Sequence, residues 1–193
     1  MKKKTKREHF LEESLKLIHE KGFKATTLRD IAHKLDCEVA NIYNYIDSKQ
    51  SLLELHLFEV QQVFMDRMEQ ILDSTLSPKE QLQQLIASYI QISNARPFEQ
   101  ALIVNEWRYL SEPKLKEFQS KRKLYEQQLQ TILKDGIELG EFRNMDIDIA
   151  TQSILGSLRW VYTKFIDPDL KPNPIEIEKQ LTNFIFGAIV YHD

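Results

Sequence analysis

The sequence is poor in glycine, proline and cysteine. Its 193 residues include five glycines, six prolines and a single cysteine, Cys37. Glycine and proline together reach only about half of their average share. Because hairpin turns, barrel corners and phosphate-cradling loops need glycine at positive φ, this shortage argues against an all-β fold. A lone cysteine excludes an internal disulfide and a cysteine-rich zinc site.

Several functional signatures are also missing. There is no GxGxxG or GxxxxGK[ST] phosphate-binding motif and no HExxH or GxSxG, and the five histidines are scattered. No apolar run approaches the ~20 residues of a membrane span. The basic N-terminus has no apolar stretch behind it, as a secretory signal would. We therefore expect a cytoplasmic, mostly helical protein that is not an enzyme and uses no cofactor or metal.

Charge is unevenly distributed along the chain. The net charge is −3, yet residues 1–49 hold eleven Lys/Arg and eight Asp/Glu, which gives +3 there and −6 in the remainder. Such an asymmetry is typical of a basic head that meets a polyanion and an acidic body that does not.

Local signals predict three short helices and a long one near the N-terminus. Apolar residues over 5–21 recur at helical spacing, and Gly22 follows as a left-handed C-terminal glycine. Thr27 and Asp30 form a capping box for a second helix, a turn at 36–38 leads to a third over 38–45, and Ser48 caps a helix to residue 72. Two short helices joined by a tight turn predict a helix-turn-helix head.

The run GFKATTLRDIAHKLDCEVANIYNYIDSKQSLL resembles the N-terminal signature of TetR-family transcriptional regulators. That pattern reads G-[FY]-x-x-[AT]-[ST], then D-I-A, a turn, and L-Y-x-[HY]-F-x-[ST]-K-x-x-L, and the match covers residues 8–53. The resemblance implies an all-α fold, with a three-helix helix-turn-helix head followed by a helical ligand-binding and dimerisation bundle. We expect the DNA-binding domain at 1–50, its motif at about 27–46, and the bundle at 51–193.

The sequence departs from the family in the turn. Asp36, Cys37 and Glu38 replace the usual Gly-Val-Ser, while Ala40 stands where many members have glycine and Ile46 where most have phenylalanine. We expect the cysteine to be a small core residue, although a redox role stays open. A carboxylate at position 38 would repel phosphate, so we expect it to cap the recognition helix instead.

The third helix is the predicted recognition helix. Its outward positions would be Val39, Asn41, Asn44 and Tyr45; asparagine can pair bidentately with adenine, and valine can touch a thymine methyl. The resemblance implies phosphate contacts at Thr27, Tyr43, Tyr45 and Lys49, and the arm at 2–7 adds basic charge. Alternatively, the tyrosines only pack the head. The predicted DNA-binding residues are Thr27, Val39, Ala40, Asn41, Tyr43, Asn44, Tyr45 and Lys49.

The rest of the chain predicts a bundle. Helices are expected over 78–95, 98–110, 113–139, 146–166 and 174–191, about nine in all. Residues 98–165 are loosely similar to the C-terminal domain of acyl-CoA-responsive TetR regulators of lipid metabolism, which implies an apolar slot with arginines for a thioester or phosphates. Alternatively, the aromatics are core, and Arg122 snorkels or pairs with an acid such as Glu106. The candidate ligand-binding residues are Phe98, Trp107, Arg108, Arg122, Tyr125 and Trp160.

In the family, the last two helices pair with their twofold mates, and here Gly156 and Gly187 would allow close approach. A homodimer on a palindromic operator follows. We therefore predict a ligand-responsive transcriptional regulator, a repressor released by a small hydrophobic inducer. The alternative, a non-enzymatic helical adaptor or membrane-surface binding protein, leaves the pattern from Thr27 to Lys49 unexplained.

Overall fold

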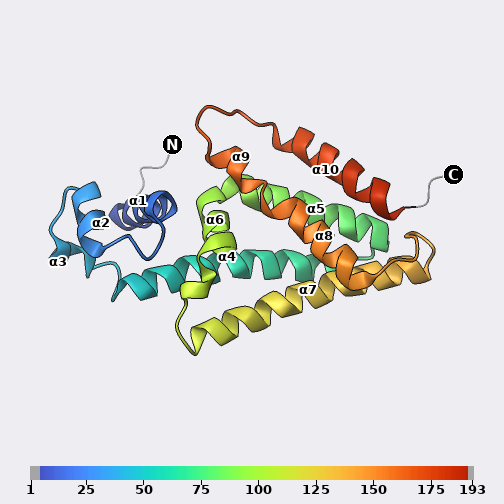
Figure 1. Ribbon diagram of the computed structural model, residues 1–193, viewed down its shortest axis with the longest axis horizontal. Coiled ribbons are helices and arrows are strands. Elements are labelled where there is room, and N and C mark those ends of the chain that lie inside the picture. Colours follow the sequence, from blue (N-terminus) through green and yellow to red (C-terminus); the bar gives the residue numbers. More distant parts are fainter. Residues whose placement is uncertain (1–4, 191–193) are drawn as a thin grey trace. The chain divides into compact units, whose positions relative to one another are not determined.

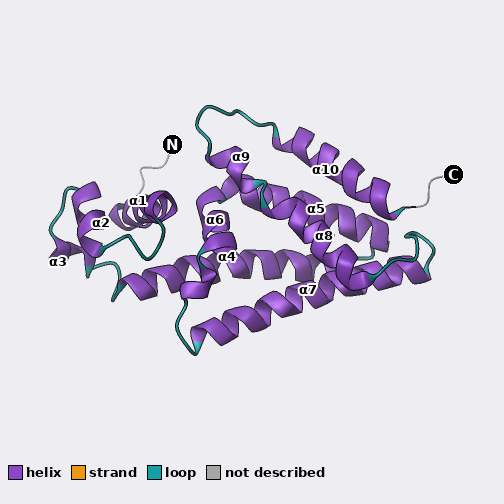
Figure 2. Cartoon of the chain, in the orientation of Figure 1, coloured by secondary structure: helices purple, strands orange, loops and turns teal. Residues whose placement is uncertain are grey.

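A computed structural model describes residues 5–190, and within that span all regular structure is helical (Figures 1 and 2). The predicted all-α fold is confirmed. The helices are α1 (Lys6–Lys21), α2 (Leu28–Lys34), α3 (Val39–Ile42), α4 (Lys49–Leu72), α5 (Pro78–Ala95), α6 (Pro97–Asn105), the 3-10 helix η1 (Trp107–Tyr109), α7 (Lys114–Glu138), α8 (Ile147–Arg159), α9 (Tyr162–Ile166) and α10 (Pro174–Ile189).

The chain forms two compact units. The head unit comprises residues up to Val60 together with Phe98–Phe118, and the body unit comprises Gln61–Pro97 and the residues from Gln119 onward. The helices α4 and α7 therefore contribute residues to both units. The predicted division at residue 50 assigned 98–118 to the bundle, whereas this segment packs with the helix-turn-helix, and Leu102, Leu110 and Phe118 belong to the same core.

The head unit is built from α1, α2 and α3 around one apolar core. Phe10 and Ile18 of α1, Ile31 of α2 and Ile42 of α3 are almost fully buried and join Leu53 of α4. Polar caps fix where the helices begin: Thr5 forms a capping box with Glu8, and the Ser48 hydroxyl accepts the N–H of Ser51 at 3.0 Å. The core thus sets the position of the two short helices that the sequence pattern singled out.

In the body unit, α8, α9 and α10 all pack against α5, which can be followed in Figure 1. The helix α5 begins with Ser77 as its N-cap and Pro78 at its first position, and the cap is a full capping box with Glu80. Leu82, Ile86 and Ile90 are fully buried along its inner face.

Three predicted helices are shorter than expected. The helix over 38–45 ends at Ile42, the helix over 98–110 gives way to η1 after Asn105, and the helix over 146–166 divides into α8 and α9 around Trp160. Gly22 has positive φ as predicted, but its φ of 82° with ψ of 151° is not the left-handed helical conformation. Helix ends lack a strong local signal at these points, since neither glycine nor proline interrupts the pattern.

Gly136, within α7, is a position where a close contact with Phe142 requires glycine. A Cβ built there would clash with the ring of Phe142, which is buried after the chain turns back at Gly140. At Gly156 and Gly187, by contrast, nothing in the described chain lies within 4 Å of a built Cβ. Their predicted role, close approach between the helices of two protomers, stays a prediction.

Candidate DNA-binding and ligand-binding surfaces

A ring of hydrogen bonds holds the first turn of α2. The Asp30 N–H donates to Thr27 Oγ1 at 3.1 Å, and the Thr27 N–H and hydroxyl donate to Asp30 Oδ2 at 2.8 and 2.5 Å. Lys21 Nζ donates to Asp30 Oδ1 at 2.8 Å. The bonds from Lys21 and Thr27 hold the pKa of the Asp30 carboxyl well below its usual range. The predicted capping box is confirmed. Both Thr27 donors are engaged inside the chain, and its phosphate contact stays a prediction.

The turn between α2 and α3 contains the residues that depart from the family pattern. Asp36 has φ of 49°, a left-handed conformation that aspartate tolerates better than most residues. Cys37 is half-buried against the head core, as expected. Glu38 is the N-cap residue of α3 but makes no side-chain capping hydrogen bond. The predicted carboxylate cap is therefore wrong: the side chain is exposed, where water hydrates its charge.

The segment 39–45 presents a polar outer face and an apolar inner face. Ala40, Asn41 and Asn44 are exposed, and Tyr43 is 56% exposed. Ile42 and Ile46 are buried and form the inner face. These four exposed residues stand on a segment anchored in the core by Ile42 and Ile46, and they can reach a partner.

Val39 and Tyr45, on the same segment, are only half-exposed. Val39 is half-buried against the head core. The Tyr45 ring stacks on Phe10 of α1, with centroids 4.9 Å apart and planes inclined by 21°. The packing that was considered for both tyrosines thus applies to Tyr45, whereas Tyr43 is free of it.

Lys49 at the start of α4 contacts the loop between α1 and α2. Its ammonium donates to the carbonyls of Phe23 and Thr26, each at 2.7 Å, and lies 4.4 Å from the centroid of the Phe23 ring. The predicted phosphate-binding lysine thus has strong partners within the head unit. Lys2, Lys3 and Lys4 of the predicted basic arm lie outside the described residues.

The six candidate ligand-binding residues do not belong to one unit. Phe98 and Trp107 pack against the head core: Phe98 meets His19 edge-on at 5.5 Å, and Trp107 stacks on Phe118 at 6.1 Å. Arg108 is exposed and lies over the Trp107 ring at 4.7 Å. The core alternative therefore describes Phe98 and Trp107 well. Arg122, Tyr125 and Trp160 belong to the body unit.

Tyr125 belongs to an aromatic cluster in the body unit. Phe64 lies between Tyr89 and Tyr125, with centroids 5.0 and 6.1 Å away. Burial, with a smaller contribution from Tyr89, raises the pKa of the Tyr125 hydroxyl well above its usual range, although the residue as a whole is only half-buried. The Tyr125 hydroxyl therefore stays neutral. Trp160, by contrast, is 44% exposed.

Two body-unit arginines share one carboxylate. Glu126 Oε1 lies 3.5 Å from Arg122 Nε and 3.6 Å from Arg159 Nη2. The acid suggested for Arg122 was Glu106, whose Oε2 instead accepts the Phe23 N–H at 3.4 Å within the head unit. That suggestion is therefore wrong. The spacing of four residues between Arg122 and Glu126 was a signal that could have found the partner.

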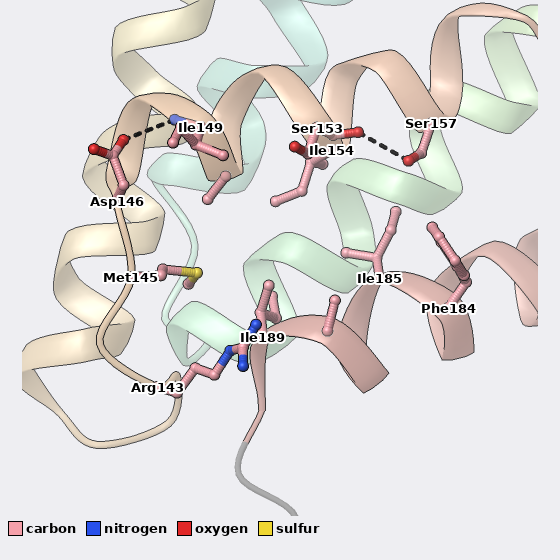
Figure 3. Close-up of a pocket in the computed structure, with 12 residues that line it drawn as sticks. Arg143, Met145, Asp146, Ile149, Ser153, Ile154, Ser157, Phe184, Ile185 and Ile189 are labelled. Carbon is pink, nitrogen blue, oxygen red and sulfur yellow. Dashed lines mark hydrogen bonds between the residues drawn. The ribbon is translucent and has the colours of Figure 1, made fainter.

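A shallow apolar hollow lies between α8, α10 and the segment before α8 (Figure 3). Its volume is about 190 Å³, below the roughly 300–1,000 Å³ of small-molecule pockets. Phe184 and Ile149 at its edge are each 67% exposed. Large apolar side chains on two adjacent helices are typical of a surface that another protein covers. The sequence predicted that the last two helices pair with a second copy. It did not indicate that Arg143 and Met145, which precede α8, also line the hollow.

No group of three or more His, Cys, Asp or Glu side chains among residues 5–190 could hold a metal ion. No helix in the same span is long and apolar enough to cross a membrane.

The arrangement of α2, the turn and α3 defines the class of protein: a helix-turn-helix whose second helix turns polar side chains outward. Comparison with known families agrees. The model for bacterial regulatory proteins of the tetR family matches residues 10–55, and that for the tetracyclin repressor-like C-terminal domain matches residues 75–189. The chain belongs to the TetR family. It is a ligand-responsive, DNA-binding transcriptional regulator, as its sequence predicted.

Individual relatives share the whole length of the chain. The transcriptional repressor KstR2 of Mycolicibacterium smegmatis is 25% identical over 187 residues, 96% of this chain and 91% of the relative. The solved structure of ketosteroid transcriptional regulator KstR2 of Mycobacterium tuberculosis covers 99% of this chain and 98% of its own, with a TM-score of 0.91 at 23% identity. AibR, solved in complex with isovaleryl coenzyme A and operator DNA, covers 94% and 98%, with a TM-score of 0.80 at 22% identity. The two structures share the fold of this chain.

Proposed function

We propose that this protein is a cytoplasmic, dimeric, non-enzymatic repressor that binds a palindromic operator and is released by an acyl-CoA. The observation that carries the proposal is the outer face of the segment 39–45, where exposed polar residues stand opposite a buried inner face. The alternative of an adaptor or membrane-surface protein gives this face no role.

The contacts with DNA divide by exposure. Asn41 and Asn44 are the residues that we assign to base edges, since both are exposed and asparagine matches the donor and acceptor of adenine. Ala40 is small enough to let the segment approach the groove. Tyr43 is the phosphate ligand that the geometry supports best, because its hydroxyl-bearing ring is exposed. We assign Val39 and Tyr45 to the edge of the same DNA-binding surface.

The hollow between α8 and α10 supports the dimer. Phe184 and Ile149 would lose water on pairing with the same helices of a second copy, and a palindromic operator needs that twofold symmetry. Gly156 and Gly187 lie on these two helices, and a Cβ built at either one has no atom within 4 Å apart from its own helix backbone and chain neighbours, so both positions leave room for close approach across the twofold axis.

The proposed ligand class rests on chemistry in the body unit and on one relative. AibR was solved with isovaleryl coenzyme A, which is an acyl-CoA. The body unit places an aromatic cluster around Tyr125 and a pair of arginines, Arg122 and Arg159, on one carboxylate. Guanidinium groups match a phosphate or a thioester carbonyl, and these two stand in an otherwise acidic body. Trp160, the sixth candidate ligand-binding residue, directly follows Arg159 at the end of α8.

A titration tests the ligand class. A fluorescently labelled duplex, recovered by the protein from a random DNA library, is bound and then titrated with acyl-CoAs of increasing chain length. Free CoA and free fatty acids serve as controls. We expect an acyl-CoA to lower the anisotropy and to quench the emission of Trp160, the tryptophan of the body unit. If no acyl-CoA releases the duplex or changes the emission, the acyl-CoA proposal fails while the DNA-binding function stands.

A further inference from the structure

The ammonium of Lys49 hydrogen-bonds to one loop of the head unit, residues 23–26 between α1 and α2. Its ammonium donates to the carbonyls of Phe23 and Thr26 at 2.7 Å and makes a longer contact of 3.4 Å with that of Lys24. An ammonium has three donors and no acceptor, so each donor has an acceptor within the chain. The two short distances are typical of charge-assisted hydrogen bonds.

The loop that Lys49 binds is fixed from its other side as well. Phe23 is buried, and its N–H donates to Glu106 Oε2 at 3.4 Å. Thr26 is fully buried, and its hydroxyl donates to the Gly22 carbonyl at 2.8 Å. Lys49 therefore supplies the contacts on the carbonyl side of a loop whose other groups are already held.

The position of this loop determines where α2 begins. Thr26 directly precedes Thr27, the N-cap of α2, and α2 packs on α3. Without the ammonium, the carbonyls of Phe23 and Thr26 would need new partners in a partly buried place, so the loop would shift or loosen. A shift there moves the first turn of α2 and the recognition segment that packs on it.

We propose that Lys49 is a positioning residue, which sets the start of α2 through the loop 23–26 and makes no contact of its own with a DNA phosphate. The proposal rests on the DNA-binding function of the head unit. To reach a phosphate, the ammonium would have to leave two short hydrogen bonds and the face of the Phe23 ring.

The chain offers matched variants that separate the two roles. Lys49→Met keeps the aliphatic stem over Phe23 and removes the ammonium. Thr26→Val disturbs the same loop through a buried, uncharged side chain that cannot touch DNA. Lys123→Met removes one exposed charge from α7 in the body unit. Affinity for a labelled duplex, recovered by the wild type from a random library, is measured by anisotropy over a series of salt concentrations.

We expect Lys49→Met to lower affinity by at least about tenfold at every salt concentration, with the salt slope of the wild type. Thr26→Val should lower affinity with the same unchanged slope. The double variant should lose little more affinity than the single variant with the larger loss, because both substitutions act on one loop. Hydrogen exchange at amides 24–28 should be faster in Lys49→Met and unchanged in Lys123→Met.

A direct phosphate contact predicts the opposite pattern. The salt slope would fall by about 0.9 per subunit, and the losses of Lys49→Met and Thr26→Val would multiply. Either result, or unchanged exchange at amides 24–28, overturns the proposal. If the wild type and Lys123→Met recover no duplex at all, the DNA-binding function has failed instead, and hydrogen exchange still decides the role of Lys49.

Discussion

Phe184 on α10 gives the sharpest test of the dimer. The side chain is 67% exposed at the edge of the hollow between α8 and α10 (Figure 3). Burying a whole phenylalanine side chain yields about 1.5–3 kcal/mol, so covering the exposed two thirds yields about 1–2 kcal/mol. A twofold dimer buries two copies, and Phe184→Ala should therefore cost about 2–4 kcal/mol of association free energy, which raises the dimer Kd roughly 30- to 700-fold.

Sedimentation velocity over a dilution series measures that Kd. The control is Leu124→Ala: Leu124 is also a large exposed apolar residue, at 45%, but it lies on α7 and does not line the hollow. The control should dimerise like the wild type. Equal Kd values for wild type and Phe184→Ala would refute the assignment of this face to the dimer interface, and a loss in Leu124→Ala alone would move the interface to α7.

Three further changes test other parts of the structure. Gly136→Ala should destabilise the body unit, because the overpacking cost of about 1–3 kcal/mol against Phe142 exceeds the helix-propensity gain of at most about 1 kcal/mol; a higher melting temperature would show that the ring moves aside freely. Glu38→Gln should raise affinity for random-sequence and selected DNA alike, by about 1.5- to 5-fold per subunit, because it removes an exposed carboxylate near phosphates; weaker binding to the selected site alone would mean that Glu38 accepts a hydrogen bond from a base. Asn41→Ala or Asn44→Ala should cost about 1–3 kcal/mol on the selected duplex and little on random DNA, whereas equal losses on both would assign these side chains to the backbone.

Features coded by neighbouring residues were predictable from the sequence. The capping boxes at Thr27 and Ser77 and the buried Ile42 and Ile46 follow from spacings of three or four residues. Such signals act within one helical turn, so they need no knowledge of the fold. The helix-turn-helix could be predicted for the same reason, because its pattern is confined to a short run.

Features that depend on distant contacts could not be predicted in this way. The partners of Lys49 are carbonyls 23 to 26 residues earlier, and backbone carbonyls carry no mark in the sequence. The packing of Phe98 and Trp107 into the head unit depends on where α6 runs, which their aromatic character does not show. Trp160 ends α8 without a glycine or proline to signal it.

The central claim is that two copies of α3, related by a twofold axis, read DNA. In vitro selection with the full-length protein, from a library of random duplexes, tests it most directly. The account predicts an enriched inverted repeat whose half-sites are centred one helical turn, about 34–36 Å, or a multiple of it apart. An enriched site without inverted symmetry, or no enrichment at salt concentrations where the protein is a dimer, would contradict it.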